Sequence, residues 1–190
     1  MPEIIKIPIQ DLTNDFLRKL REQYRGADVE IRIQPPQGGS PLSEDDFWKI
    51  ISLLDWEQED EEAIVAPAVE YLAQLPVGHI YRFEDILSEK LYRLDTLAHA
   101  DHSGENAYGD GEDFSVDEFL YARCCVVANG RKAYEGVLND PQEMPKDLTF
   151  EPLLSLAAQA YERQTGRPFR YAPEYRYETF SHTEGFPSPR

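Results

Sequence analysis

The chain has 190 residues and a formal net charge of −17, and 41% of its residues are hydrophobic and 12% aromatic. This apolar content supports a folded core and excludes a wholly disordered chain. No apolar run approaches the roughly 20 residues that span a bilayer, and the net charge disfavours nucleic acid and anionic membranes as partners. We therefore predict a folded protein that binds neither.

The negative charge is concentrated in the middle of the chain. Residues 41–114 carry nineteen acidic and four basic residues, whereas residues 1–40 carry six of each and residues 115–190 carry eleven and nine. Such a field attracts basic proteins or metal cations. Solubility alone is the alternative explanation of an acidic surface.

The start of the chain and its two cysteines predict a cytoplasmic location. The first twelve residues have no basic n-region and no long apolar stretch, so we expect no secretory signal. Cys124 and Cys125 are adjacent on a predicted helix and point about 100° apart, which is poor geometry for a disulfide. We expect two buried thiols in a reducing compartment.

Residues 1–36 are predicted to form a small β-α-β arm. Apolar residues alternate in residues 5–9 and 29–33, which is typical of strands, and a helix between them is capped by Thr13 and ended by Gly26. Two strands alone are not stable, so the arm must pair with a later strand or with another copy of the chain. It is therefore a candidate surface for a homo-oligomer.

The stretch QPPQGGSP, residues 34–41, is rich in proline and glycine. We therefore predict a linker at residues 37–43. Residues 44–166 then have helical periodicity, and we predict a bundle of about five helices. Ser43 with Asp46 and Ser115 with Glu118 are predicted capping boxes. The periodic segments are residues 44–54, 60–74, 78–100, 115–128, 131–138 and 149–166.

Residues 167–190 form a tail in which tyrosine and phenylalanine alternate with arginine. Residues 175–180 are a candidate third strand that would pair with the N-terminal arm. Aromatic and basic residues together also stack on nucleic acid. The acidity of the whole chain favours the structural interpretation.

Several motifs in residues 44–166 occur in the order found in one protein family. They are Phe47-Trp48, FEDIL at residues 83–87, KLYRLDT at 90–96, AHA at 98–100, FLYARC at 119–124, VANG at 127–130 and MPKD at 144–147. The region resembles the Domain of Unknown Function 4240 family. The resemblance implies a bacterial cytoplasmic protein, and it brings no established activity, catalytic residue or cofactor.

One candidate metal site lies near the end of the long predicted helix. Asp95 and His99 are four residues apart and share a helical face, and Asp101 and His102 follow them. Imidazole and carboxylate ligands suit a divalent metal that could activate water for hydrolysis. The alternative is a helix C-terminus at which His99 is hydrogen-bonded to Asp95 and His102 is exposed. We favour this alternative, because no strong ligand motif such as H-E-x-x-H is present.

The loop after this helix also has part of the pattern of a calcium loop. Asp101, Ser103, Glu105 and Glu112 fall at ligand positions of a twelve-residue helix–loop–helix site. Asn106 occupies the position where glycine is normally required, which counts against the site.

A second candidate is a binding cleft between the long helix and the helix over residues 115–128. Arg123 could pair there with Asp95 or Glu84, and the simpler interpretation is an internal ion pair that sets the helix register. The residues that we expect at this cleft are Tyr92, Tyr121, Arg123 and Asn129, with Trp48 or Trp56.

The functional prediction is a non-enzymatic protein-binding or regulatory module, similar in kind to an antitoxin or an immunity protein. We expect no cofactor. The expected partner is a protein, and the acidic surface would favour a basic one. The acidic residues expected to bind are Glu57, Glu59, Glu61 and Glu62. The alternative prediction is a metal-dependent hydrolase that uses Asp95, His99, Asp101 and His102.

Overall fold

The chain divides into two compact units, residues 1–34 and residues 35–190. The described part of the first unit contains one helix, α1 (Asn14–Gln23), which the Thr13 side chain caps by accepting the N–H of Phe16 at 3.3 Å. The predicted boundaries of arm, linker, helical domain and tail stay predictions. The computed structural model describes residues 13–26, 41–104, 107–109 and 114–186.

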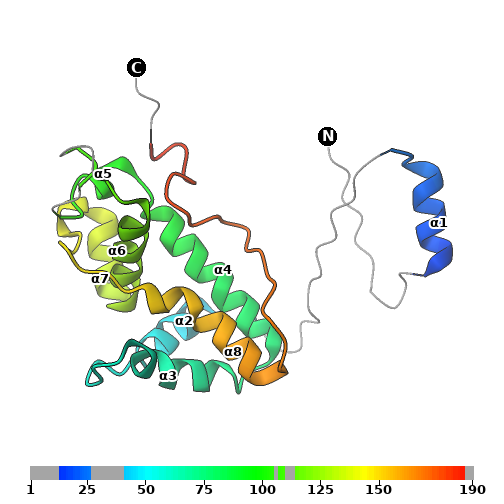
Figure 1. Cartoon of the computed structure of the whole chain (residues 1–190), viewed down its shortest axis with the longest axis horizontal. Helices are drawn as coiled ribbons and strands as arrows, with labels where there is room; N and C mark the ends of the chain where they lie inside the picture. Colours follow the sequence, from blue (N-terminus) through cyan, green and yellow to red (C-terminus); the bar gives the residue numbers. More distant parts are fainter. Residues whose placement is uncertain (1–12, 27–40, 105–106, 110–113, 187–190) are drawn as a thin grey trace. The chain divides into compact units, whose positions relative to one another are not determined.

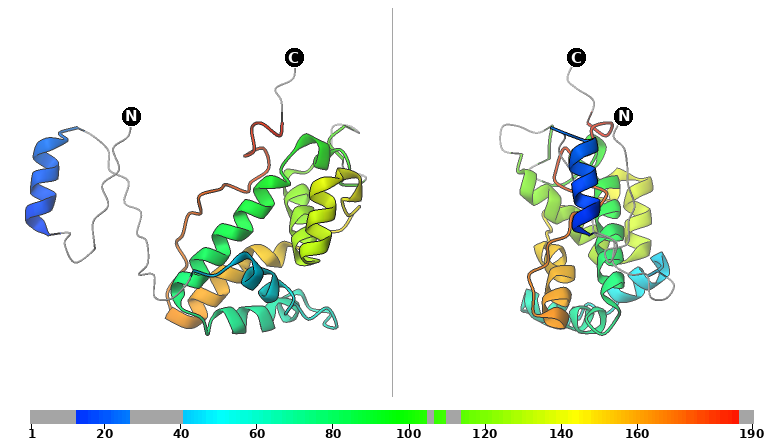
Figure 2. Two further views of the ribbon diagram at one scale, coloured as in Figure 1. Left: turned by 180° about the vertical axis from the view of Figure 1, so that it is seen from behind. Right: turned by 90° about the vertical axis from the view of Figure 1, so that its right-hand side faces the viewer.

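The described residues of the second unit are helical. Its long helix α4 packs against α2, α6 and α8 (Figures 1 and 2). Among the described helices, none has the combination of length and apolar character that a membrane crossing requires. In chain order the helices are α2 (Glu44–Ile51), α3 (Glu61–Leu72), α4 (Val77–Arg93), α5 (Leu97–Ala100), α6 (Val116–Ala128), α7 (Arg131–Asn139), the 3-10 helices η2 (Pro141–Glu143) and η3 (Glu151–Ser155), and α8 (Leu156–Thr165).

The predicted fold of about five helices with a β-α-β arm is wrong. The described part of the chain contains eight α-helices and no strand. One cause of the undercount is the predicted helix over residues 78–100, which is two helices. The first of them, α4, ends at Arg93, and the Thr96 side chain accepts the N–H of His99 and so begins α5.

The three predicted strands have different outcomes. Residues 5–9 and 29–33 lie outside the described residues, whereas residues 175–180 are described and consist of bends, a turn and irregular backbone. A strand needs a neighbouring strand for its backbone hydrogen bonds. The N–H of Phe180 instead donates to the carboxylate of Asp95 at 3.2 Å, so a side chain takes the place of a sheet partner.

Helix α4 buries one apolar face. Ile80, Phe83, Leu87 and Leu91 are all fully buried. Helix α6 is buried on most of its faces, and both of its cysteines are free and buried, as predicted. Burial raises the pKa of the Cys124 thiol, so this group stays protonated at neutral pH.

Local capping signals also agree with the structure. Ser43 and Asp46 form a capping box at the start of α2. Gly166 has a φ of 67° and ends α8 in the left-handed conformation that glycine favours. Pro67 lies inside α3, which begins at Glu61 because the Asp60 carboxylate caps it.

We call residues 167–186 the C-terminal segment. It has no helix and no strand, and it runs along α4 (Figures 1 and 2). The Tyr171 hydroxyl donates to the Asp85 carboxylate at 2.8 Å, and the Gly185 carbonyl accepts the N–H of Leu97 at 2.9 Å. The segment therefore covers one face of α4 along much of its length.

Candidate functional site

The loop between α2 and α3, residues 53–60, is held in shape by its own side chains. The Asp55 carboxylate accepts the N–H of Glu57 at 3.2 Å and the side-chain amide of Gln58 at 2.9 Å. The N–H of Asp55 donates to the carbonyl of Ile64 at 3.0 Å, which closes the loop onto α3. We call these residues the Trp56 loop.

The Trp56 side chain is presented to solvent by this loop. It is 51% exposed, and its ring packs on Phe150 with 5.1 Å between the ring centroids. Leu53, at the start of the loop, is 37% exposed. Large apolar side chains that are exposed on a rigid support are typical anchors of protein interfaces.

Four carboxylates follow this anchor closely in the sequence. Glu57 and Glu59 lie in the loop, and Glu61 and Glu62 begin α3; all four are exposed. Within the described part of the chain, no lysine, arginine or histidine forms an ion pair with any of them. An exposed apolar anchor with carboxylates near it in the chain is complementary to a basic surface that also carries apolar side chains.

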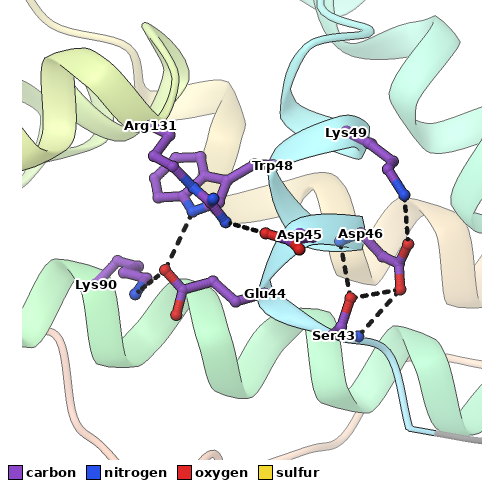
Figure 3. Close-up of polar contacts among 8 residues, drawn as sticks. All are labelled: Ser43, Glu44, Asp45, Asp46, Trp48, Lys49, Lys90 and Arg131. Carbon is purple, nitrogen blue, oxygen red and sulfur yellow. Dashed lines mark hydrogen bonds and ion pairs between the residues drawn. The ribbon is translucent and has the colours of Figure 1, made fainter.

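The second tryptophan has a different role. Trp48 is 7% exposed and packs against Phe47 and Tyr134, so it belongs to the core. Its indole N–H donates to the Glu44 carboxylate at 3.2 Å, and this carboxylate also binds the Lys90 ammonium at 2.8 Å (Figure 3). The hydrogen bond from Lys90 is the main cause of the lowered pKa of Glu44.

A shallow hollow of about 420 Å³ lies beside Trp48. Its charged groups pair within the chain: Arg131 binds the Asp45 carboxylate at 2.6 Å, and Lys49 binds Asp46 at 3.1 Å (Figure 3). The Arg131 guanidinium also lies 6.0 Å from the centre of the Trp48 ring. Because opposite charges neutralise each other here, this hollow offers no net charge to a ligand.

Of the two partners predicted for Arg123, Asp95 and Glu84, the structure pairs it with Asp95. Both side chains are fully buried, and a guanidinium nitrogen lies 3.8 Å from the carboxylate. Arg123 also donates to the Leu91 carbonyl at 2.9 Å and to the Thr179 hydroxyl at 3.0 Å. The pair therefore ties α4, α6 and the C-terminal segment together.

The four residues of the predicted metal site have separate partners. The Asp95 carboxylate accepts the N–H groups of Phe180 and His182 at 3.2 and 3.0 Å. The His99 ring lies 2.7 Å from the Thr96 hydroxyl and 3.1 Å from the Val137 carbonyl. Burial is the main cause that lowers the pKa of His99.

The remaining two candidates lie at the end of α5. The His102 ring contacts the Ala98 carbonyl at 2.8 Å, and Asp101 is exposed. Over the described residues, no three His, Cys, Asp or Glu side chains are grouped so that they could hold a metal ion. The calcium-loop candidates Glu105 and Glu112 lie outside the described residues.

The residues of the predicted cleft do not converge. The Tyr92 ring lies 4.4 Å from that of His182, under the C-terminal segment. Tyr121 is half-buried, and its carbonyl accepts the N–H of Phe150 at 3.0 Å. The Asn129 side chain donates to the Cys125 carbonyl at 2.8 Å and so helps to end α6.

A family model for proteins of unknown function, DUF4240, matches residues 42–163, which is more than half of the chain. The chain belongs to the DUF4240 family. This confirms the resemblance seen in the motifs of residues 44–166. No match was found among curated proteins or among solved structures.

The DUF4240 region contains the whole Trp56 loop and α4, whereas the C-terminal segment follows it in the chain. Three residues of these surfaces were not identified from the sequence. Phe150 supports Trp56, Thr179 receives the Arg123 hydrogen bond, and Leu53 extends the exposed apolar surface. Only for Leu53 was there a signal, because it directly precedes the core residue Leu54 and continues the apolar run beyond α2.

Proposed function

We propose that this member of the DUF4240 family is a protein-binding module whose Trp56 loop docks a basic segment of a partner protein. The observation that carries the proposal is a half-exposed tryptophan on a loop that hydrogen bonds hold in shape, beside carboxylates that have no cationic partner in the described part of the chain. The indole ring supplies apolar contact area, and the carboxylates attract and orient the basic segment.

A rigid loop favours such binding for an energetic reason. Each long side chain or loop that becomes ordered on binding reduces the affinity by its lost conformational freedom. Asp55 holds the loop before any partner arrives, through the contacts to Glu57, Gln58 and Ile64. The exposed glutamates also raise the association rate of a basic partner, and this effect weakens as salt is added.

Site-specific photo-crosslinking tests the proposal. A photoreactive phenylalanine analogue replaces Trp56, and in a matched control it replaces Tyr71, which is 47% exposed on α3. In extracts of the source cells we expect the Trp56 probe to capture a protein with a basic segment at the crosslinked position. The Tyr71 probe should not capture it.

Charge reversal then tests the role of the carboxylates. Glu57→Lys with Glu59→Lys should weaken binding of the captured protein at least tenfold, whereas Glu135→Lys with Glu162→Lys makes the same change in net charge on exposed positions of α7 and α8 and should leave it unchanged. Trp56→Ala should weaken binding by about 2 kcal/mol, roughly 30-fold in Kd. Equal capture at Tyr71, or equal loss in both double variants, would contradict the proposal.

A further inference from the structure

The C-terminal segment covers a buried carboxylate on α4. Glu84 is 5% exposed, and the segment's Tyr171 donates a hydrogen bond to the adjacent residue Asp85. Burial, followed by the negative charge of Glu84, raises the pKa of Tyr177 to about 12, so this second tyrosine of the segment lies within electrostatic reach of Glu84. Tyr177 packs against the hydrophobic core, and the segment runs along this part of α4 (Figure 1).

The Glu84 carboxylate has no hydrogen bond and no ion pair with the described residues. In contrast, Asp85 on α4 and Asp95 just after it both accept hydrogen bonds from the C-terminal segment. Burial, reinforced by the negative charge of Asp85, raises the pKa of Glu84 to about 7. An unpaired ionised carboxylate is costly to bury, whereas its protonated form is much less so.

Each element that packs on α4 contributes titratable groups, and within the described residues none of them forms a hydrogen bond or an ion pair with Glu84. Helix α6 contributes Arg123, whose charge faces Asp95, and the buried thiol Cys124. Helix α8 contributes Tyr161, against Tyr81, and α2 contributes Glu44, which binds Lys90. The C-terminal segment contributes Tyr171, Tyr177, Glu174, Glu178 and His182.

We propose that the C-terminal segment is a pH-sensitive latch, which lies on α4 while Glu84 is protonated and is released more readily once Glu84 is ionised. Release gives the carboxylate access to water, so the ionised form favours the released state. In the docked state the Glu84 carboxyl group keeps its proton up to about pH 7, whereas in the released state it ionises in the ordinary acidic range of glutamate. Release therefore becomes more favourable as the pH rises to about 7 and then levels off.

The contacts at the far end of the segment are suited to a reversible latch. Phe180 has a φ of 72°, which is strained for a bulky residue, and the two N–H groups donated to Asp95 hold this conformation. Thr179 accepts from Arg123 and donates to the Val116 carbonyl at 2.7 Å. Release would relax the strain and expose the polar groups of Asp95 and Arg123.

Hydrogen exchange of the full chain, followed by mass spectrometry of peptides from residues 171–182, tests the latch. After correction for the intrinsic pH dependence of exchange, the segment should be about tenfold less protected at pH 8 than at pH 6. Glu84→Gln removes the titrating group, so the protection of the segment in this variant should be the same at both pH values. The inference is independent of the Trp56 loop, which this experiment does not probe.

Two matched variants complete the test. Glu89→Gln removes a carboxylate from the same helix, one that pairs with Arg93, and it should behave as the parent chain does. His182→Gln removes the imidazole of the segment and should also leave the pH dependence in place. Protection of the parent chain that does not change between pH 6 and pH 8 would overturn the latch. So would pH dependence that persists in Glu84→Gln or disappears in His182→Gln.

Discussion

The Trp56 loop and the face of α4 under the C-terminal segment are both rich in carboxylates, but they use them differently. Glu57 and Glu59 of the loop are exposed and have no cationic partner in the described part of the chain. Asp85 and Asp95 are bound by the C-terminal segment, and Glu84, next to Asp85 in the chain, is buried without a partner among the described residues. In the proposed function, the exposed carboxylates of the loop bind another molecule, whereas Asp85 and Asp95 hold the chain's own C-terminal segment.

The difference shows that burial under another segment determines how much a charged residue contributes to the stability of the fold. In water, an unpaired glutamate is well solvated and an ion pair contributes little. Under a covering segment, an ionised carboxylate needs hydrogen-bond donors or a cation. Removing one partner of such a buried pair strongly lowers the free energy of unfolding. Three substitutions, from the most to the least covered carboxylate, test this comparison through the free energy of unfolding.

The largest effect is expected for Asp95→Ala. This change leaves the buried guanidinium of Arg123 without its carboxylate and two N–H groups of the C-terminal segment without an acceptor. The free energy of unfolding in urea should fall by about 3–5 kcal/mol. Asp101→Ala, at an exposed position directly after α5, is the control and should change the free energy of unfolding by less than about 0.5 kcal/mol.

An intermediate effect is expected for Glu44→Ala. The side chain of Glu44 is half exposed, but it binds Lys90, whose side chain is only 6% exposed. Removing the carboxylate should reduce the free energy of unfolding by about 1 kcal/mol. Because the pKa of Glu44 is lowered, its contribution is present above the ordinary glutamate range and is lost as the pH falls through the lowered pKa.

The double variant Glu44→Ala with Lys90→Met checks the cause of that loss. Methionine fills the space without bringing a charge that needs a partner, so most of the lost stability should return. If the double variant is less stable than Glu44→Ala, the buried ammonium is held by its other contact, the Tyr134 ring at 5.2 Å from Lys90.

The smallest effect is expected for Asp45→Asn. Its ion pair with Arg131 is short, at 2.6 Å, yet the two side chains are 72% and 41% exposed. The free energy of unfolding should change by less than about 0.5 kcal/mol, and the change should shrink further in 1 M salt. A loss above about 1 kcal/mol would show that exposure alone does not set the strength of these pairs.

The two tryptophans show how far the sequence can predict a site. Trp48 and Trp56 lie eight residues apart, and both were candidates for binding. Trp48 is buried because α2 directs it toward Tyr134 of α7, whereas Trp56 lies beyond the end of α2 on a loop that α3 closes. Periodicity locates a helix, but it does not determine which of its neighbours will cover a given side chain.

The sequence by itself determined the features that depend on nearby residues. The capping box of Ser43 and Asp46, the helix end at Gly166 and the apolar seam of α4 are set by contacts within a few residues, so a linear pattern contains them. Membership of the DUF4240 family is of the same kind, because it rests on motifs along the chain.

Only the tertiary structure decided which carboxylates are covered. Thr179 meets Arg123 across 56 residues, and Phe180 meets Asp95 across 85, so no local pattern predicts either contact. The same is true of Glu84, which a helical pattern alone would leave exposed next to Asp85. Burial and charge pairing depend on which segments pack together in space, and the interactions that set them are not local in sequence.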